Sequence, residues 1–394
     1  MRFFRLFVIG LLFIGFSRGE TFQQVLDRAL KESPYIKSLE NTRKVAAGEI
    51  KGAKLLPNPE LSLTFGRLYS QTDSGVALTD FSISQPLMLW GTRKYAVEKA
   101  KVFQKYMDAY IETLKREFTG QLYIKFFTAL YMLKSKEIAE KNLQISKNTF
   151  EFIKESYSLG EESRINFLRA KREYEKAKME YQKASLEYEK ALKELSATAG
   201  FDVSSVEGKL SRIPHLKDIN PDEIPSIKAL ISQIEELDKN IRLQKALAKP
   251  QISVEFVGGE DPVDLGKYEF GIGISSTLPV FNRNQGEIIK SSAKKSALQQ
   301  ELIYRKKQIS SRIASIKKAF QLYKKQLNTV ENEILPQLEE GMKLAEESLS
   351  LREITPFEFY NWKREYIQTL LYRFELYYQI HSAYGEYIKI GGAQ

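Results

Sequence analysis

The chain has 394 residues with ordinary shares of apolar and aromatic side chains, which argues against a disordered protein. It contains no cysteine, so disulfides, thiolate metal sites and a lipid-bearing N-terminal cysteine are excluded. The formal charge is +10, but basic residues alternate with glutamate along the predicted helices, as in Lys171-Arg172-Glu173, and this pattern is typical of solvated helix faces rather than of nucleic-acid binding.

Residues 1–19 are predicted to be a signal peptide. Two arginines precede an apolar core over residues 6–16, and the small residues Ser17 and Gly19 stand before a cleavage site at Glu20. The alternative is a membrane anchor, but the apolar run is shorter than the roughly 20 residues that a spanning helix needs. We therefore expect the mature chain to be exported.

Comparison of the chain with itself indicates a tandem duplication. The segment PELSLTF at residues 59–65 returns as PQISVEF at 250–256, and KREY at 171–174 returns unchanged at 363–366. The separation stays at 191 or 192 positions, which predicts one architecture used twice. The expected domains are a first structural repeat over residues 20–199, an inter-repeat linker rich in Pro, Asp and Ser over 200–223, and a second structural repeat over 224–394.

Each repeat is predicted to form a helix, two strands, a very long helix and a return helix. The first helix, residues 34–56, ends at a Pro-Asn-Pro motif because proline cannot donate a helical hydrogen bond. Period-two alternation then predicts strands, and apolar residues every three or four positions predict coiled-coil helices. The predicted strands are 58–68, 77–89, 251–259 and 268–280, the long helices 92–157 and 286–350, and the return helices 161–198 and 355–388.

Proline also distinguishes the two long helices. Pro336 removes a backbone donor within the second one, so we expect a bend there. The first repeat has Gln144 at the equivalent position and should lack that bend.

The strands decide between two architectures. Taken alone, the helices fit a soluble coiled coil, so a periplasmic adaptor or scaffold protein is one alternative. Four strands cannot close a membrane barrel, and open edges cannot lie in lipid, but three chains supply twelve strands. The predicted fold is therefore mostly α with a small β part: a trimeric 12-stranded outer-membrane β-barrel continuous with a coiled-coil α-helical periplasmic tunnel.

Four motifs occur in order within this duplicated frame: LLPNP at residues 55–59, SQPL at 84–87, YSLG at 157–160 and LPVFNRNQG at 278–286. Together they resemble the TolC family of outer-membrane efflux proteins over essentially the whole mature chain. The last motif is closest to the heavy-metal branch, the cobalt–zinc–cadmium and copper–silver exporters.

The resemblance implies a homotrimer in the outer membrane of a Gram-negative-type bacterium, in contact with outer-membrane lipid and with a large periplasmic portion. It further implies a periplasmic adaptor (membrane fusion) protein and an inner-membrane pump, a proton-driven RND-type exporter. The chain would be a passive exit duct for metal ions or small toxic molecules. A protein-secretion duct of the same family is also compatible with the sequence.

The resemblance places adaptor docking at the two helix reversals, where the family has a Val/Leu-Gly pair. The candidate docking residues are Leu159, Gly160 and Glu161 in the first repeat and Leu351, Arg352 and Glu353 in the second. Loss of the glycine at Arg352 puts symmetrical docking in doubt. Family members can carry acidic rings at the tunnel aperture, and the register gives Asn166 and Glu358 as the aperture or gate candidates.

No pattern of an enzyme is present in the sequence. The two histidines, His215 and His381, are far apart, and no zinc-protease, nucleophile-elbow or phosphate-loop motif occurs. We therefore expect no catalytic residues, no cofactor and no resident metal, and the pump would have to supply the energy for transport.

Overall fold

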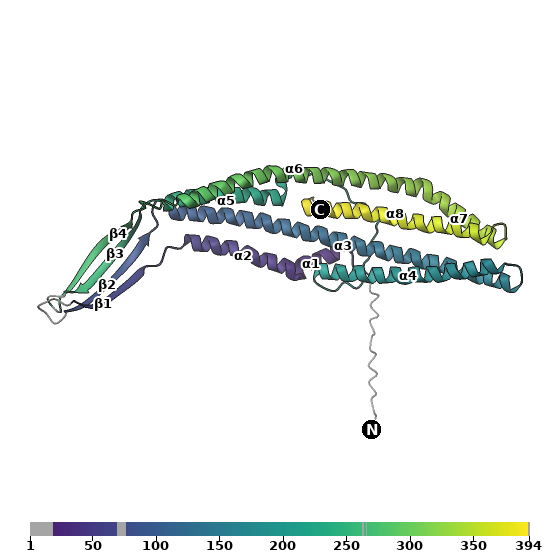
Figure 1. Cartoon of the computed structure of the whole chain (residues 1–394), viewed down its shortest axis with the longest axis horizontal. Helices are drawn as coiled ribbons and strands as arrows, with labels where there is room; N and C mark the ends of the chain where they lie inside the picture. Colours follow the sequence, from purple (N-terminus) through teal and green to yellow (C-terminus); the bar gives the residue numbers. More distant parts are fainter. Residues whose placement is uncertain (1–18, 69–75, 262–263, 265, 393–394) are drawn as a thin grey trace, which may run out of the picture. The chain divides into compact units, whose positions relative to one another are not determined.

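The structure is a computed structural model that describes residues 19–68, 76–261, 264 and 266–392 (Figure 1). The predicted signal peptide, apart from Gly19, lies outside the described residues. The prediction of a mostly helical fold with a small sheet is confirmed. No helix in the described ranges is both long and apolar enough to cross a membrane.

The chain forms two compact units that do not follow the two repeats, because each unit takes segments from both. We call them the helical unit and the sheet unit. The helical unit comprises residues 1–37, 116–218 and 313–394, and the sheet unit comprises residues 38–115 and 219–312.

The sheet unit contains one antiparallel four-stranded sheet in the order β1-β2-β3-β4. Each repeat contributes one hairpin, and β2 pairs with β3 to join them. Helices α2 and α5 lead into the hairpins, and α3 and α6 leave them (Figure 1). The bounds are α2 Pro34–Lys54, β1 Glu60–Leu68, β2 Val76–Leu87, α5 Pro225–Leu247, β3 Gln251–Glu260 and β4 Tyr268–Thr277.

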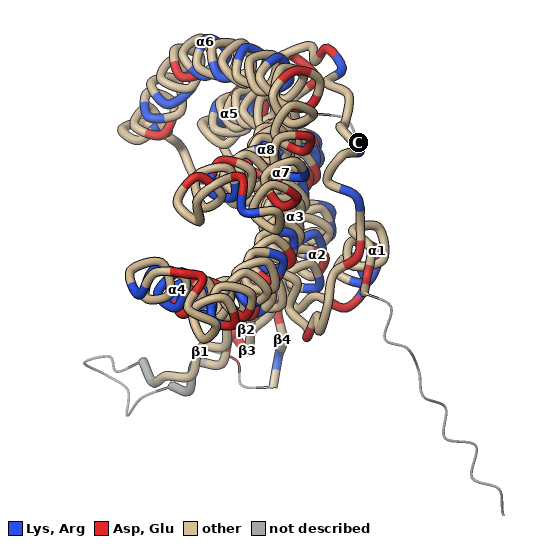
Figure 2. The backbone as a smooth tube through the Cα atoms, turned by 90° about the vertical axis from the view of Figure 1, so that its right-hand side faces the viewer, with Lys and Arg blue, Asp and Glu red and all other residues tan. Residues whose placement is uncertain are grey.

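The long helix α3, Thr92–Ser158, has 67 residues and so extends roughly 100 Å. In the helical unit its C-terminal part runs beside the return helix α4, Arg164–Ala199, and a second antiparallel pair is formed by α7, Leu335–Ser350, and α8, Pro356–Ile390 (Figure 1). Basic and acidic residues alternate along these helices (Figure 2), as expected for solvated faces. Their apolar side chains form a common core that includes Ile138, Ile153, Leu338, Met342, Phe359, Ile367 and Leu370.

The second long helix is not continuous. Helix α6, Gln285–Thr329, passes into a five-residue π-helical turn, Val330–Ile334, before α7 begins. Pro336 follows directly and cannot donate a backbone bond, and the Leu335 N–H reaches back to the carbonyl of Val330. A π-helical turn therefore interrupts the second long helix just before Pro336, where we predicted a bend, and α3 is an uninterrupted α-helix at Gln144.

Helix α1, Phe22–Glu32, is an element that the sequence analysis did not anticipate. It begins with a capping box between Thr21 and Gln24, and its buried residues Val25, Leu26 and Ala29 recur at helical spacing. The Thr-x-x-Gln pattern before an apolar run is a recognised start signal, so this helix could have been predicted.

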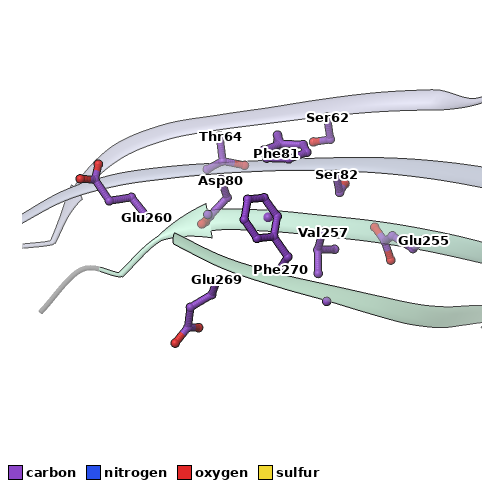
Figure 3. A pocket seen from close by; sticks show the side chains of 13 residues that line it. Ser62, Thr64, Asp80, Phe81, Ser82, Glu255, Val257, Glu260, Glu269 and Phe270 are labelled. Carbon is purple, nitrogen blue, oxygen red and sulfur yellow. The ribbon is translucent and has the colours of Figure 1, made fainter. Parts of the chain in front are cut away.

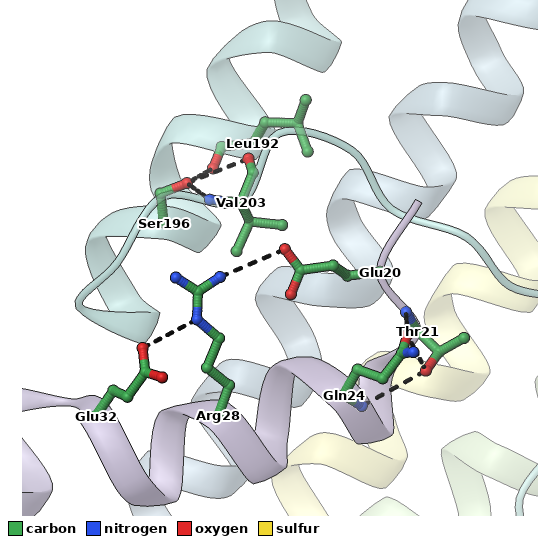
Figure 4. Close-up of polar contacts among 8 residues, drawn as sticks. All are labelled: Glu20, Thr21, Gln24, Arg28, Glu32, Leu192, Ser196 and Val203. Carbon is green, nitrogen blue, oxygen red and sulfur yellow. Dashed lines mark hydrogen bonds and ion pairs between the residues drawn. The ribbon is translucent and has the colours of Figure 1, made fainter. Parts of the chain in front are cut away.

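The inter-repeat linker is held on the helical unit by a few specific contacts (Figure 4). Ser196 on α4 donates to the carbonyl of Leu192 and accepts from the N–H of Val203 at 2.9 Å. Glu20 forms a parallel bridge with Val206, and its carboxylate lies 3.6 Å from Arg28. The linker thus follows a defined path, and Val203, Val206 and Leu210 are buried.

Candidate functional site

The two helix reversals share one backbone conformation. Gly160 has a φ of 77° and Arg352 a φ of 63°, both in the left-handed region. The next N–H in each reversal bonds to a carbonyl five residues back, from Glu161 to Ser156 at 2.9 Å and from Glu353 to Ser348 at 2.8 Å. This is the hydrogen bond of a Schellman turn, which usually ends in glycine. Loss of the glycine in the second repeat therefore leaves the turn unchanged.

The exposed side chains of the reversals also correspond. Leu159 is 67% exposed and Leu351 is 68% exposed, each one residue before the left-handed position. An ion pair between Arg352 and Glu161 connects the two reversals directly. The docking residues proposed from the sequence are thus brought together in one place within the helical unit.

The two aperture candidates occupy equivalent positions in the first turns of the return helices. The N–H of Asn166 donates to Ser163 at 3.3 Å, and that of Glu358 donates to Thr355 at 3.3 Å. The Glu358 carboxylate also accepts from the Thr355 N–H at 2.8 Å, which completes a capping box. This bond, together with one from the Thr355 hydroxyl, lowers the pKa of Glu358.

A carboxylate caps the first return helix as well, but it comes from a different position. Glu162 accepts from the N–H of Ser163 at 2.7 Å and from the side-chain amide of Asn166 at 2.9 Å. At the predicted aperture positions an acid was expected only in the second repeat, because the register aligns Glu358 with Asn166 and does not indicate Glu162. Both reversals therefore carry an acid within one turn of the return helix.

Several backbone N–H groups and carbonyls beside both reversals are paired internally by the turns and caps described above. What the reversals present outward is a pair of leucines beside a mixture of charges.

The sheet presents one apolar face. Residues paired across antiparallel strands point to the same side, and one such row consists of Leu61, Ile83, Phe256 and Ile272. Ile272 is 81% exposed, and its neighbour Ile274 is exposed as well. No helix among the described residues covers this face, and its large side chains are exposed to solvent.

The opposite face is polar and acidic (Figure 3). Ser62, Ser82 and Gly271 form one row with Val257, and Thr64 and Asp80 lie in the next row with Glu269. Together with Glu255 they line a concavity of about 530 Å³. Among the described side chains of this face there is no lysine or arginine.

Two buried polar residues of α8 were not recognised in the sequence. The first is Lys363, which is 5% exposed and donates to Ser146 on α3 at 2.8 Å. Burial lowers the pKa of Lys363 to about 8, although Glu173 and Glu180 act in the opposite direction. Its counterpart in the first repeat, Lys171, is exposed. The KREY motif is identical in both repeats, so no signal in the sequence separates the two lysines.

The second is His381, which is 1% exposed and stacks on Phe127 at 3.8 Å. Its Nε2 lies 2.9 Å from the carbonyl oxygen of Leu210, which can only accept, so Nε2 carries the proton. Nδ1 then accepts from the hydroxyl of Tyr123 at 2.7 Å. Burial lowers the pKa of His381 to about 4, so this side chain is neutral at pH 7 and ties the linker to α3 and α8.

No group of three or more histidine, aspartate or glutamate side chains in the described part of the chain could hold a metal ion. The acidic residues of the sheet and of the reversals are spread out rather than convergent.

Comparison with known proteins agrees with this arrangement. Residues 25–200 match the model of the family "Outer membrane efflux protein". The chain is 19% identical over 306 residues to the cobalt-zinc-cadmium resistance protein CzcC of Cupriavidus metallidurans, covering 76% of this chain and 72% of that protein.

The fold is shared with solved outer-membrane proteins. VceC from Vibrio cholerae superposes with a TM-score of 0.78 at 16% identity, covering 94% of this chain and 96% of VceC. The CmeC outer membrane channel of Campylobacter jejuni gives a TM-score of 0.76 at 16% identity, covering 94% of this chain and 85% of CmeC. The chain is thus similar to outer membrane efflux proteins over residues 25–200, and it shares the fold of solved outer-membrane proteins over 94% of its length.

Proposed function

We propose that this chain is the outer-membrane exit duct of a tripartite efflux system and conducts its substrates passively. The observation that carries the proposal is the sheet, which exposes an apolar face on one side and an acidic face on the other. An apolar face of this kind is stable in lipid, and a polar face is stable against water.

The sheet also needs further copies of itself. Strands β1 and β4 are its edges, and unpaired backbone groups at an edge are costly in hydrocarbon. Three copies supply twelve strands and allow a closed barrel with the apolar face toward the lipid. The duct is therefore a homotrimer in the outer membrane, with the helices forming a coiled-coil tunnel in the periplasm.

The reversals are the surface for the periplasmic adaptor protein. The exposed leucines Leu159 and Leu351 supply two equivalent apolar contacts, and the ion pair between Glu161 and Arg352 supplies charge beside them. Gly160 and Glu353 complete the two turns. Through the adaptor the duct works with an inner-membrane pump, a proton-driven RND-type exporter, which provides the energy.

Metal cations are the favoured substrates of the duct. The polar face of the sheet carries Glu60, Asp80, Glu255 and Glu269, so a lumen lined by it attracts cations. The similarity to a cobalt-zinc-cadmium resistance protein supports the same choice. The acidic lining would also admit small cationic toxic molecules, so the preference for metal cations depends on that similarity.

The trimer is tested by light scattering of the purified protein in detergent, combined with heat-modifiable migration on gels. We expect a mass of three copies and a band that shifts on heating. A stable, folded monomer in a mild detergent would contradict the proposal, because four strands cannot close.

The gate is tested by conductance of the trimer in planar bilayers. Glu358→Gln removes a charge but keeps the capping box, since glutamine can fill the same position. We expect lower cation selectivity in this variant at low salt and a smaller difference at high salt. The matched variant Asn166→Asp should raise cation selectivity, and unchanged selectivity in both would remove these positions from the gate.

A further inference from the structure

Four segments of the sheet unit meet at one end of the sheet. They are the segments where helices pass into strands or strands into helices. Because the strands are antiparallel, all four segments lie at the same end of the sheet (Figure 1). We call them the junction collar. The collar consists of residues 51–59, 88–94, 245–251 and 278–286.

The junction collar has a strongly one-sided charge. It contains seven basic residues and no aspartate or glutamate, and all seven basic side chains are exposed: Lys51, Lys54, Arg93, Lys94, Lys245, Lys249 and Arg283. Within the described part of the chain, none of the seven forms an ion pair with a carboxylate. At the opposite end of the sheet, the described residues include four acids, Glu260, Asp261, Asp264 and Glu269, together with the basic residues Arg67 and Lys267.

The same collar exposes large apolar side chains. Phe281 is 92% exposed, and Leu278 and Val280 beside it are also exposed. They directly follow β4, three polar residues after Ile274, which is the last large apolar side chain of the strand. Leu55 and Leu56 add a second exposed apolar pair before β1.

Trp90 is held rigidly within this surface. Its backbone has a φ of 59°, which is uncommon for a residue other than glycine. Its indole N–H donates to the carbonyl of Pro250 at 2.7 Å, and the ammonium of Lys249 lies 5.0 Å from its ring centroid. An aromatic ring fixed beside a cation is suited to the boundary between hydrocarbon and headgroups.

We propose that the junction collar binds an anionic phospholipid surface, with its apolar side chains in the acyl boundary and its basic side chains on lipid phosphates. The proposal rests on the proposed function, because it requires the apolar face of the sheet to lie in lipid. Charge complementarity and continuity with that face point to a lipid surface as the occupant.

Trp90 provides an intrinsic probe, because Trp362 is the only other tryptophan. The Trp362→Phe trimer is reconstituted into phosphatidylcholine vesicles that contain a fixed share of brominated phosphatidylglycerol or, in parallel, of brominated phosphatidylcholine. Bromine quenches a nearby indole. We expect quenching of Trp90 by the anionic lipid to exceed quenching by the neutral lipid at least about twofold at low salt.

Two sets of substitutions test the role of charge. The collar variant Lys54→Gln/Lys245→Gln/Arg283→Gln should bring the ratio of the two quenching efficiencies toward one, as should high salt. The control variant Lys171→Gln/Lys178→Gln/Lys193→Gln removes three exposed charges from α4 and should leave the ratio unchanged. Heat-modifiable migration verifies that each variant is assembled.

A separate probe distinguishes failure of this inference from failure of the proposed function. Phe270→Trp, combined with Trp90→Phe and Trp362→Phe, reports from the apolar face of the sheet. If this probe is quenched by both lipids while Trp90 responds equally to both, the sheet lies in lipid and the charge-selective collar is wrong. If neither probe is quenched, the sheet is not in the membrane and the proposed function fails as well.

Discussion

The sheet and the helical unit depart from the usual distribution of side chains in opposite ways. The sheet exposes large apolar side chains, whereas the helical unit buries polar ones. The sheet holds Ile272 and Ile274 in solvent, whereas the helical unit buries Lys363 and His381. Exposed apolar surface raises the free energy of a protein in water by roughly 25 cal/mol per Å², and a buried charge raises it when it lacks a full set of partners.

The exposed apolar face of the sheet and the buried polar groups of the helical unit are stabilised in different ways. Under the proposed function, lipid stabilises the apolar face of the sheet, whose large side chains are exposed in the described part of the single chain. The buried groups of the helical unit instead have hydrogen-bond partners within the chain, Ser146 for Lys363 and Tyr123 and Leu210 for His381. Under the proposed function the sheet therefore needs lipid and further copies of the chain. The buried polar groups of the helical unit need no other molecule, because their partners lie in the same chain.

The largest expected effect comes from charging the apolar face. Ile272→Asp places three carboxylates in lipid in a trimer, so we expect loss of the heat-modifiable form and of the protein from outer-membrane fractions. Gly273 points to the polar face, so Gly273→Asp should be tolerated better.

A neutral substitution makes that comparison cleaner. A side chain at Gly273 would lie 3.9 Å from Glu255, so an aspartate there would meet a like charge, whereas Gly273→Ser would not. We expect normal assembly of the serine variant. Equal loss of assembly in Ile272→Asp and Gly273→Ser would show that the assignment of faces is wrong.

The next effect is the acid sensitivity of the helical unit. An unfolded histidine has a pKa near 6.5, and the folded pKa of His381 is about 4, so the unfolded state binds more protons between these values. Stability should therefore fall as the pH drops from 6.5 to 4, by about 3 kcal/mol at most. Melting of the helical signal by circular dichroism measures this loss.

Two histidine substitutions separate the loss of stability caused by protonation of His381 from the effects of other titrating groups. His381→Gln removes the titration and should flatten the pH dependence. His215→Gln, at an exposed position, should leave it as in the wild type. An unchanged slope in His381→Gln would refute the assignment.

A smaller effect is expected at the buried lysine. The folded pKa of Lys363, about 8, lies below its unfolded value of 10.5, so stability should rise as the pH increases between them. Lys363→Met removes the buried charge and should stabilise the protein at pH 7 by about 1–2 kcal/mol. Lys171→Met changes an exposed residue and should have an effect within about 0.5 kcal/mol. Marked destabilisation by Lys363→Met would mean that the contact with Ser146 outweighs the desolvation of the charge.

The apolar sheet face could be predicted from the sequence because its signal is local. Alternation of Leu61 and Leu63 with serine and threonine fixes both the strand and its two faces. The proline motif after α2 and the repeat register likewise locate helix ends within a few residues. The compact units were not predictable in this way, because they combine distant segments of both repeats.

The buried polar groups could not be predicted, for a related reason. Whether a lysine on a helix faces solvent depends on a third helix, and the KREY motif carries no information about it. The caps at the reversals were only partly visible. Thr355 and Glu358 follow a capping-box pattern, but the use of Glu162 in the first repeat depends on the geometry of the turn.

The smallest expected effects lie at the two reversals, where exposed apolar and charged groups occur together. Arg352 adopts a backbone conformation that favours glycine, at a cost of roughly 1–2 kcal/mol, and its ion pair with Glu161 is solvent-exposed and contributes at most about 1 kcal/mol. Arg352→Gly should therefore leave the melting temperature unchanged or raise it slightly. Gly160→Arg has room for the side chain but meets the same backbone penalty, so it should destabilise by about 1 kcal/mol. Glu161→Gln removes the ion pair without touching the backbone and isolates its contribution. If Arg352→Gly destabilises more than Glu161→Gln does, the arginine stabilises the reversal through contacts beyond the ion pair, and the two turns are not equivalent in energy despite their common backbone.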